Sequence, residues 1–203
     1  IFLPMMRGIT RVGDEENAVV CPIVQASPDM LRQDLGADIA DRIVSPVIDI
    51  GKGNLESSDF VESCQRLAKG LGKVGMPWWN AYQLALAAQQ RFDESCLELG
   101  QKALDFCAEL DLTPIVVLGR AYTIYNKVLN SNIPAIVREQ GAIAIPVDCY
   151  PVDDDVPVFK DMYWGYGQRN LRAAHQIRRS SGVYSLWCSN YACGPDSFNL
   201  HFY

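Results

Sequence analysis

The chain has 203 residues, of which 49% are hydrophobic and 21% are charged. This is the composition of an ordinary globular protein, and it excludes both an intrinsically disordered chain and a coiled coil. Eighteen basic and 24 acidic residues give a net charge of −6, which argues against nucleic acid as a partner. No apolar run approaches the roughly 18 residues of a membrane span, and no secretory signal stands at the start. We therefore expect a cytoplasmic protein that binds neither nucleic acid nor membrane.

The N-terminal part of the sequence predicts two strands and one helix. Residues 1–3 and 42–50 are rich in Ile, Val and Leu, as buried strands are. Ser27 is a good N-cap and Pro28 suits the first helical position, so we expect a helix over residues 28–35. The sequence begins inside an apolar run without an initiator methionine and stops inside an apolar helical pattern, as expected for a piece of a longer protein.

A long helical region is expected next. One helix begins at residues 57–58 and is broken by the glycines of residues 70–75, and a second begins at residues 76–77 and runs to about residue 110. Three cysteines lie on these helices, several turns apart, so packing in the core is favoured over metal binding for Cys64, Cys96 and Cys107.

From residue 113 onward, predicted strands alternate with predicted helices. The strands are expected at residues 114–118, 142–147 and 183–188, and the helices at 133–140 and 163–180. This alternation is typical of βαβ units and a parallel sheet. The sequence therefore predicts an α/β fold in three parts: a partial N-terminal α/β lobe at 1–54, a helical segment at 55–111, and a C-terminal α/β lobe at 112–203.

Three loops follow the carboxyl ends of the C-terminal strands, at residues 119–122, 148–151 and 190–196. Binding sites of parallel sheets gather at this edge, so we expect the three loops to meet at a site. Arg120 in the first loop could hold an anion through its guanidinium group, or it could be a surface arginine at a tight turn. Trp164 and Tyr166 flank Gly165 and would form either a stacking wall for a cofactor or an aromatic hinge in the core.

Two cysteines stand at predicted junctions between a strand and a helix. Cys193 begins the run Cys-Gly-Pro-Asp-Ser-Phe after a strand-like segment, and Cys21 is followed by Pro22 before the first helix. Backbone N–H groups at a helix start stabilise negative charge, which suits a metal-bound thiolate. The alternative is a structural cysteine at a tight turn. A pair facing one interlobe cleft could hold an iron–sulfur cluster.

Four stretches of this sequence occur in the same order in large CoA-substrate-specific enzyme activases. They begin at Cys21, Val117, Tyr163 and Cys193 and read Cys-Pro-Ile-Val-Gln, Val-Leu-Gly-Arg-Ala-Tyr, Tyr-Trp-Gly-Tyr-Gly-Gln-Arg and Cys-Gly-Pro-Asp-Ser-Phe. Essentially the whole chain resembles the region of these activases that is similar to the D component of 2-hydroxyacyl-CoA dehydratases and to double-cubane cluster proteins. One departure is Ala121, which stands where the family usually has a proline after Gly-Arg.

This resemblance implies an oxygen-sensitive [4Fe-4S] cluster held by three cysteines between flavodoxin-like α/β lobes, which a long helical segment would join here. Cys21 and Cys193 match the second and third ligand positions, and the first ligand position of the family lies upstream of Ile1. The residues Arg120, Trp164 and Tyr166 would line the cofactor. With two of three ligands, we expect the cluster in the full-length protein and not necessarily in this piece.

The resulting hypothesis is that the parent protein is an ATP-linked, iron–sulfur electron-transfer protein of the dehydratase and activase group. Its cluster would pass an electron to a CoA-ester substrate or to a redox partner protein, and ATP-hydrolysing activase modules would belong to the same parent chain. The sequence indicates neither catalytic residues nor an oligomeric state. One alternative is a cluster-free scaffold or protein-interaction domain with the same fold. Another is a small-molecule enzyme that uses an interlobe pocket without iron, against which stands the lack of a histidine or paired acids near the motifs.

Overall fold

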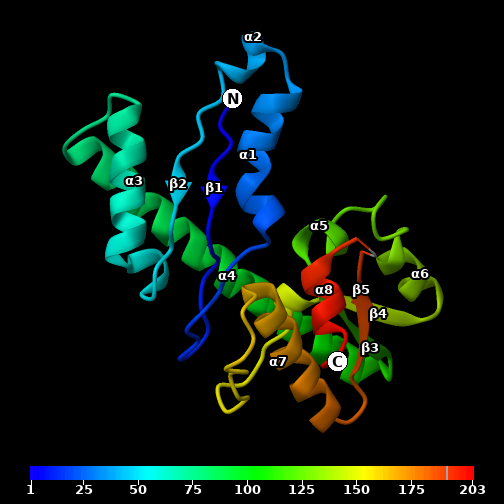
Figure 1. Ribbon diagram of the computed structural model, residues 1–203. Coiled ribbons are helices and arrows are strands. Elements are labelled where there is room, and N and C mark those ends of the chain that lie inside the picture. The colour runs from blue at the N-terminus through cyan, green and yellow to red at the C-terminus, as the bar shows by residue number, and fades with distance from the viewer. Residues whose placement is uncertain (191) are drawn as a thin grey trace. The chain divides into compact units, whose positions relative to one another are not determined.

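The computed structural model describes residues 1–190 and 192–203, which form two compact units (Figure 1). One unit comprises Ile1–Gln89 with Met162–Gly165, and the other comprises Gln90–Asp161 with Tyr166–Tyr203. Each unit holds its own parallel sheet, so the predicted α/β class and the parallel pairing are confirmed. The predicted boundaries at residues 54 and 111 stay a prediction.

The sheet of the first unit has two short parallel strands, β1 (Met5–Met6) and β2 (Val47–Ile48), with α1 (Pro22–Asp34) alongside β1 (Figure 1). The strand expected at residues 1–3 is wrong, since only an isolated bridge from Phe2 to Val44 forms there, and the strand expected at residues 42–50 is confined to Val47–Ile48. The backbone bonds from Val44 N to Ile1 O and from Leu3 N to Val44 O begin a parallel ladder. The next rung would need an N–H at residue 46, which Pro46 lacks, so the regular strand starts only after it.

The predicted start of α1 at Pro28 is also wrong, because the helix begins at Pro22 with Cys21 as its N-cap. Pro28 lies inside the helix, where it cannot donate to the carbonyl of Val24. The hydroxyl of Ser27 donates to that carbonyl instead, at 2.9 Å. Ser27 therefore satisfies the acceptor that Pro28 leaves open and is not a cap. The four-residue α2 (Ala37–Ala40) packs next to α1.

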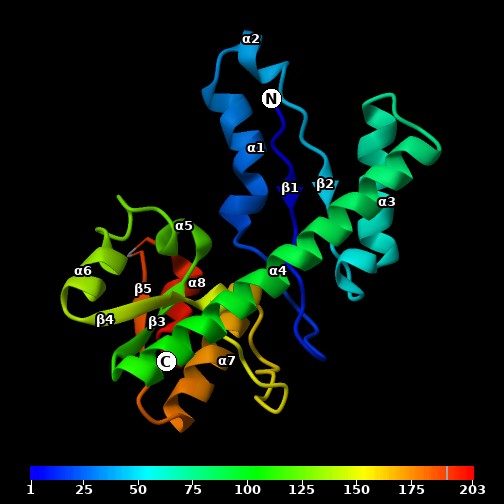
Figure 2. The same ribbon diagram turned by 180° about the vertical axis from the view of Figure 1, so that it is seen from behind.

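Two helices of the central region form as predicted. A short 3-10 turn, η1 (Asn54–Glu56), leads into α3 (Ser58–Gly70), whose N-cap Ser57 accepts a hydrogen bond from Phe60 N at 3.0 Å. Glycines separate α3 from α4 (Met76–Leu110), which is one continuous helix of 35 residues (Figure 2). None of the helices in the described part of the chain has the length and apolarity that crossing a membrane requires.

The second unit contains the three-stranded parallel sheet β4-β3-β5, formed by β3 (Thr113–Gly119), β4 (Ala142–Pro146) and β5 (Tyr184–Cys188). The connections carry α5 (Ala121–Ile124), α6 (Ile133–Glu139), the 3-10 turn η2 (Val147–Cys149), α7 (Gly165–Arg179) and, after β5, α8 (Gly194–Asn199). The predicted strands and helices of this region are confirmed to within two residues at each end. Its core is formed by the central strand and by residues of α7 and the outer strands, among them Val116, Leu118, Ile145 and Ala173.

The second half of α4 packs on this unit through a close approach at Gly100. A Cβ added at this position would overlap the carbonyl oxygen of Cys149. The backbone of α4 therefore rests directly on the turn that follows β4. Only glycine leaves room for that contact, because the obstacle is main chain and cannot rotate away.

We predict that Gly100→Ala lowers the free energy of unfolding by about 1–3 kcal/mol, because the added methyl group forces α4 away from η2. Chemical denaturation monitored by circular dichroism measures this loss. Gly70→Ala is the matched control, since a Cβ at the end of α3 meets nothing within 4 Å. It should leave stability unchanged or raise it by up to about 1 kcal/mol. Equal stability of the two variants would contradict the proposed contact.

Candidate functional site

The loops at the carboxyl edge of the three-stranded sheet are joined by side-chain hydrogen bonds. Thr123 Oγ1, just after β3, donates to the carbonyl oxygen of Cys188 at the end of β5, at 3.2 Å. The hydroxyl of Tyr125 donates to Asp148 Oδ2 after β4, at 3.0 Å. The loops at 119–122, 148–151 and 190–196 therefore lie at one edge, as the sequence predicted, although Tyr191 of the third loop lies outside the described residues.

Gly119 ends β3 in a backbone conformation that favours glycine, with φ of +148°. A Cβ at this position would lie 2.6 Å from the carbonyl oxygen of Cys188. The amide of Asn170 on α7 holds both backbone groups of Gly119, accepting from its N–H and donating to its carbonyl, each at 3.0 Å. Asn170 is fully buried, so α7 fixes the point at which the chain leaves the sheet and enters the candidate site.

A buried ion pair links the loop after β3 to α8. Arg120 Nε donates to Asp196 Oδ1 at 2.9 Å, and the two residues are only 5% and 1% exposed. Burial alone would lower the pKa of Arg120, but the hydrogen bond and the negative charge of Asp196 raise it above its ordinary value. Arg120 is therefore not a surface arginine. It is a buried cation that ties the first turn of α8 to the sheet.

Several buried polar atoms of Arg120 and of α8 have no hydrogen-bond partner within residues 1–190 and 192–203. They are Arg120 Nη2, Asp196 Oδ2 and both amide atoms of Asn199, which is 1% exposed. Buried donors and acceptors are nearly always paired in folded proteins. The arrangement thus offers a charged donor, a carboxylate oxygen that accepts, and an amide that both donates and accepts.

Cys193 is the N-cap residue of α8, three residues before Asp196 of the ion pair. Its thiol is partly exposed and makes no capping bond, and its N–H donates to the carbonyl of Asn190 at 2.9 Å. The hydroxyl of Tyr122 lies next to this sulfur. The pKa of Tyr122 is raised to about 12, first by partial burial and then by its hydrogen bond with Cys193 and the negative charge of the Cys193 thiolate. Arg120, Tyr122, Cys193 and Asp196 therefore form one group, which we call the Cys193 cluster.

The sequence pointed to Arg120 and Cys193 but missed Tyr122, Asp196 and Asn199. Tyr122 and Asp196 stand inside the two motifs that contain Arg120 and Cys193, so these motifs were the available signal. What the motifs did not reveal is that they touch, since 76 residues separate the partners of the ion pair.

The other predicted ligand, Cys21, lies in the first unit. It is the N-cap of α1, its thiol is partly exposed, and it makes no side-chain capping bond. Trp164 belongs to the same unit, where it pairs through a parallel bridge with Val19 and stacks edge to face with Tyr163 at 5.2 Å. Cys21 and Cys193 fall in different units, so their facing one hollow stays a prediction.

Tyr166 lies in the second unit at the start of α7. The guanidinium carbon of Arg169 is 5.6 Å from its ring centroid, and Arg169 also pairs with Asp148 at 2.8 Å. The pKa of Tyr166 is raised chiefly by burial. Tyr166 thus packs near the loop after β4, and its role as a wall of a cofactor site stays a prediction.

The donor atoms of the described residues decide which part of a metal site the chain can supply. In the part of the chain that the structure describes, no group of three or more His, Cys, Asp or Glu side chains is placed to hold a metal ion. Cys21 and Cys193 offer free thiols, which suit iron, but two thiolates are at most part of a ligand set. The described residues therefore fit a cluster only as partial ligands.

Cys64, Cys96, Cys107 and Cys149 are the cysteines of the central helices and of the turn after β4. Cys107 is 2% exposed, and burial raises the pKa of its thiol. Cys149 is buried beside Cys96, and its pKa is raised to about 11 by burial and by the hydrogen bond and charge of Cys96. Cys64 lines a cavity of the first unit. Raised pKa values keep Cys107 and Cys149 as neutral thiols at pH 7, which suits packing.

Comparison with known protein families identifies the class. Residues 1–150 match the CoA enzyme activase uncharacterised domain (DUF2229), which is 150 of the 203 residues. The chain belongs to this family of domains associated with CoA enzyme activases. Searches of the curated proteins and of the solved structures gave no match.

We predict that Asp196→Ala lowers the free energy of unfolding by about 3–5 kcal/mol, because it leaves the buried charge of Arg120 without a partner. Urea denaturation measures the change. Glu98→Ala is the control, since Glu98 pairs with Lys102 at 3.9 Å on the surface, where such pairs contribute less than about 1 kcal/mol. Similar losses in the two variants would show that the Arg120–Asp196 pair does not hold α8 in place.

We also predict that Cys193→Ala lowers the pKa of Tyr122 from about 12 toward the ordinary tyrosine value, because a hydrogen bond and a nearby charge are lost. Burial remains, so part of the shift should persist. NMR of ring-labelled tyrosines against pH measures it, with Tyr122→Phe to assign the signal. The pKa of Tyr166 is the internal control, because Cys193 is not among the groups that shift it. An unchanged Tyr122 pKa would refute the contact.

Proposed function

We propose that this chain is part of an iron–sulfur, ATP-linked electron-transfer protein related to 2-hydroxyacyl-CoA dehydratases. In this proposal the chain positions a [4Fe-4S] cluster between two flavodoxin-like lobes, and the cluster serves a CoA-ester substrate or a redox partner protein. Membership of a family associated with CoA enzyme activases supports the proposal. The order of the four motifs along the chain is its second support.

The observation that carries the proposal is the equivalent placement of two thiols. Cys21 and Cys193 are both N-cap residues, each helix has a proline in its first two positions, and neither sulfur is used in a capping bond. Both thiols are free and partly exposed. Thiolates are soft ligands that suit iron–sulfur clusters, so these two sulfurs are the donors that the proposal assigns.

The Cys193 cluster supplies what one such ligand needs. The Arg120–Asp196 ion pair fixes the first turn of α8 and with it the backbone that carries Cys193. The hydroxyl of Tyr122 lies beside the sulfur, where a hydrogen bond to a thiolate ligand stabilises its negative charge. A bound cluster would supply one-electron transfer, and these side chains would hold its ligand and adjust its potential.

The proposal also assigns a third thiolate that the described residues do not provide. By the resemblance it lies upstream of Ile1 in the parent protein, and the ATP-hydrolysing modules belong to that same parent chain. Arg120, Trp164 and Tyr166 are proposed to line the cofactor.

The second candidate is a cluster-free scaffold or interaction domain that keeps this fold. The observation that favours it is the donor count, since the described residues bring no three potential ligands together. In this case Cys193 would serve only as a cap residue beside Tyr122.

Anaerobic preparation of the full-length parent protein, followed by iron and sulfide analysis, distinguishes the two candidates. The cluster proposal expects about four irons per cluster and a loss of most of them in Cys21→Ser and Cys193→Ser. Cys64→Ser is the matched control, because Cys64 is a partly exposed thiol on α3 with no proposed ligand role. It should keep the full iron content.

A folded parent protein that takes up no iron would refute the cluster proposal and leave the scaffold. Iron uptake that survives both Cys21→Ser and Cys193→Ser would refute the assignment of these two ligands. Thermal unfolding monitored by circular dichroism shows whether each variant is folded.

A further inference from the structure

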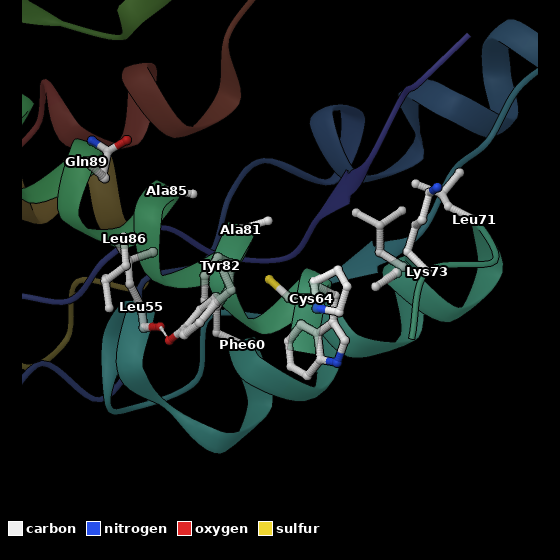
Figure 3. A pocket seen from close by; sticks show the side chains of 14 residues that line it. Leu55, Phe60, Cys64, Leu71, Lys73, Ala81, Tyr82, Ala85, Leu86 and Gln89 are labelled. Atoms are coloured by element: carbon white, nitrogen blue, oxygen red, sulfur yellow. Dashed lines mark hydrogen bonds between the residues drawn. The ribbon is translucent and has the colours of Figure 1, made fainter. Parts of the chain in front are cut away.

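An apolar cavity of about 600 Å³ lies in the first unit, between α3 and the first half of α4 (Figure 3). Phe60, Cys64 and Leu67 line it from α3, and Trp78, Tyr82 and Leu86 line it from α4. On each helix these positions recur at three- or four-residue intervals, so two apolar faces are turned toward one another. They border a space that is open to solvent on one side and has the size of small-molecule sites.

Aromatic side chains form a defined wall of this cavity. The hydroxyl of Tyr82 donates to the carbonyl of Leu55 at 2.7 Å, and its ring lies 6.3 Å from that of Phe60. Tyr82 is 8% exposed, which shows that its ring packs firmly between the elements. The cavity is therefore a preformed feature of the α3–α4 pair.

The cavity is elongated along α4. Its lining positions run from Pro77 to Gln89, a stretch that the helical rise makes about 18 Å long. In Figure 3, Lys73 and Leu71 lie at one end of the row of side chains, and Leu86 and Gln89 lie at the other. An apolar space of this length suits an extended chain better than a compact ring.

A second hollow of about 330 Å³ shares Lys73 and Trp78 with the apolar cavity. Its charged side chains are all cationic: Arg66, Lys69 and Lys73. Arg66 pairs with Glu62 at 3.6 Å on the surface, whereas Lys69 and Lys73 form no ion pair within the described ranges of the chain. The apolar cavity and a basic hollow therefore adjoin at Lys73 and Trp78, in a protein whose net charge is −6.

We propose that these adjoining hollows bind one anionic amphiphile, with an apolar chain in the cavity and a phosphate-bearing head in the basic hollow. The apolar walls favour the chain by burying it, and the cluster of cations favours a phosphate group. A neutral chain would leave the cations unused, and a free phosphate would leave the apolar walls exposed to water. This site shares no residue with the Cys193 cluster, so it goes beyond the proposed function.

The test is isothermal titration of the purified chain with dodecyl phosphate below its micelle concentration. We expect one molecule bound per chain, and at least tenfold weaker binding in the double variant with Lys69→Glu and Lys73→Glu. Lys52→Glu is the control, because it makes one such lysine charge reversal in the same unit at an exposed residue outside both hollows. It should bind as the parent chain does.

Ala85→Trp tests the other half of the site. Ala85 lines the cavity from an exposed position, so a large ring there should fill the space and abolish binding without unfolding the chain. Circular dichroism confirms that each variant is folded.

Three further probes separate binding through the apolar chain, binding through the phosphate and binding to a membrane surface. Dodecanol and inorganic phosphate should each bind at least tenfold more weakly than dodecyl phosphate. Equal binding of either one would overturn the proposal, as would normal binding by the folded double variant. Sedimentation with phosphatidic acid vesicles without binding of monomeric dodecyl phosphate would also overturn it and indicate a membrane surface. None of these outcomes bears on iron uptake, so this proposal and the proposed function fail separately.

Discussion

The buried ion pair between Arg120 and Asp196 is the constraint on which the candidate site depends. Both charges are removed from water, and a buried pair of this kind is costly to break once it has formed. It joins the loop after β3 to the first turn of α8, and so it places the backbone of Cys193 beside Tyr122. Asp196 Oδ2 and both amide atoms of Asn199 have no partner within the described residues, so they add nothing to this link.

Around this pair the unit relies on backbone contacts too close for any side chain. Gly119 passes the carbonyl of Cys188, and Gly100 lets α4 rest on the turn after β4. Asn170 then fixes both backbone groups of Gly119 from inside α7. A buried amide of this type stabilises one backbone conformation over the alternatives, because a shifted backbone would leave the amide unpaired. The loops that carry the candidate site are therefore positioned by main-chain and amide contacts.

The sequence predicted well where regular periodicity and a clear break coincide. The glycines before Met76 separate α3 from α4, and the apolar strands of the second unit form almost as expected. The sequence-based predictions failed at two prolines, whose effect on the helix or strand around them depends on neighbouring residues. Pro28 reads as the first residue of a helix, yet the hydroxyl of Ser27 allows it inside α1, and Pro46 interrupts a ladder that its apolar neighbours favour.

By itself the sequence determined the α/β class, the long helix and the two motifs that contain Arg120 and Cys193, because local propensity and short motifs encode these. Only the tertiary structure decided that the two motifs are joined by a buried ion pair, and that Tyr122 stands next to the thiol. It also decided that the apolar faces of α3 and α4 stand apart and enclose a cavity beside Lys73. The reason is that contacts between residues tens of positions apart depend on how strands order and helices pack, which no local pattern specifies.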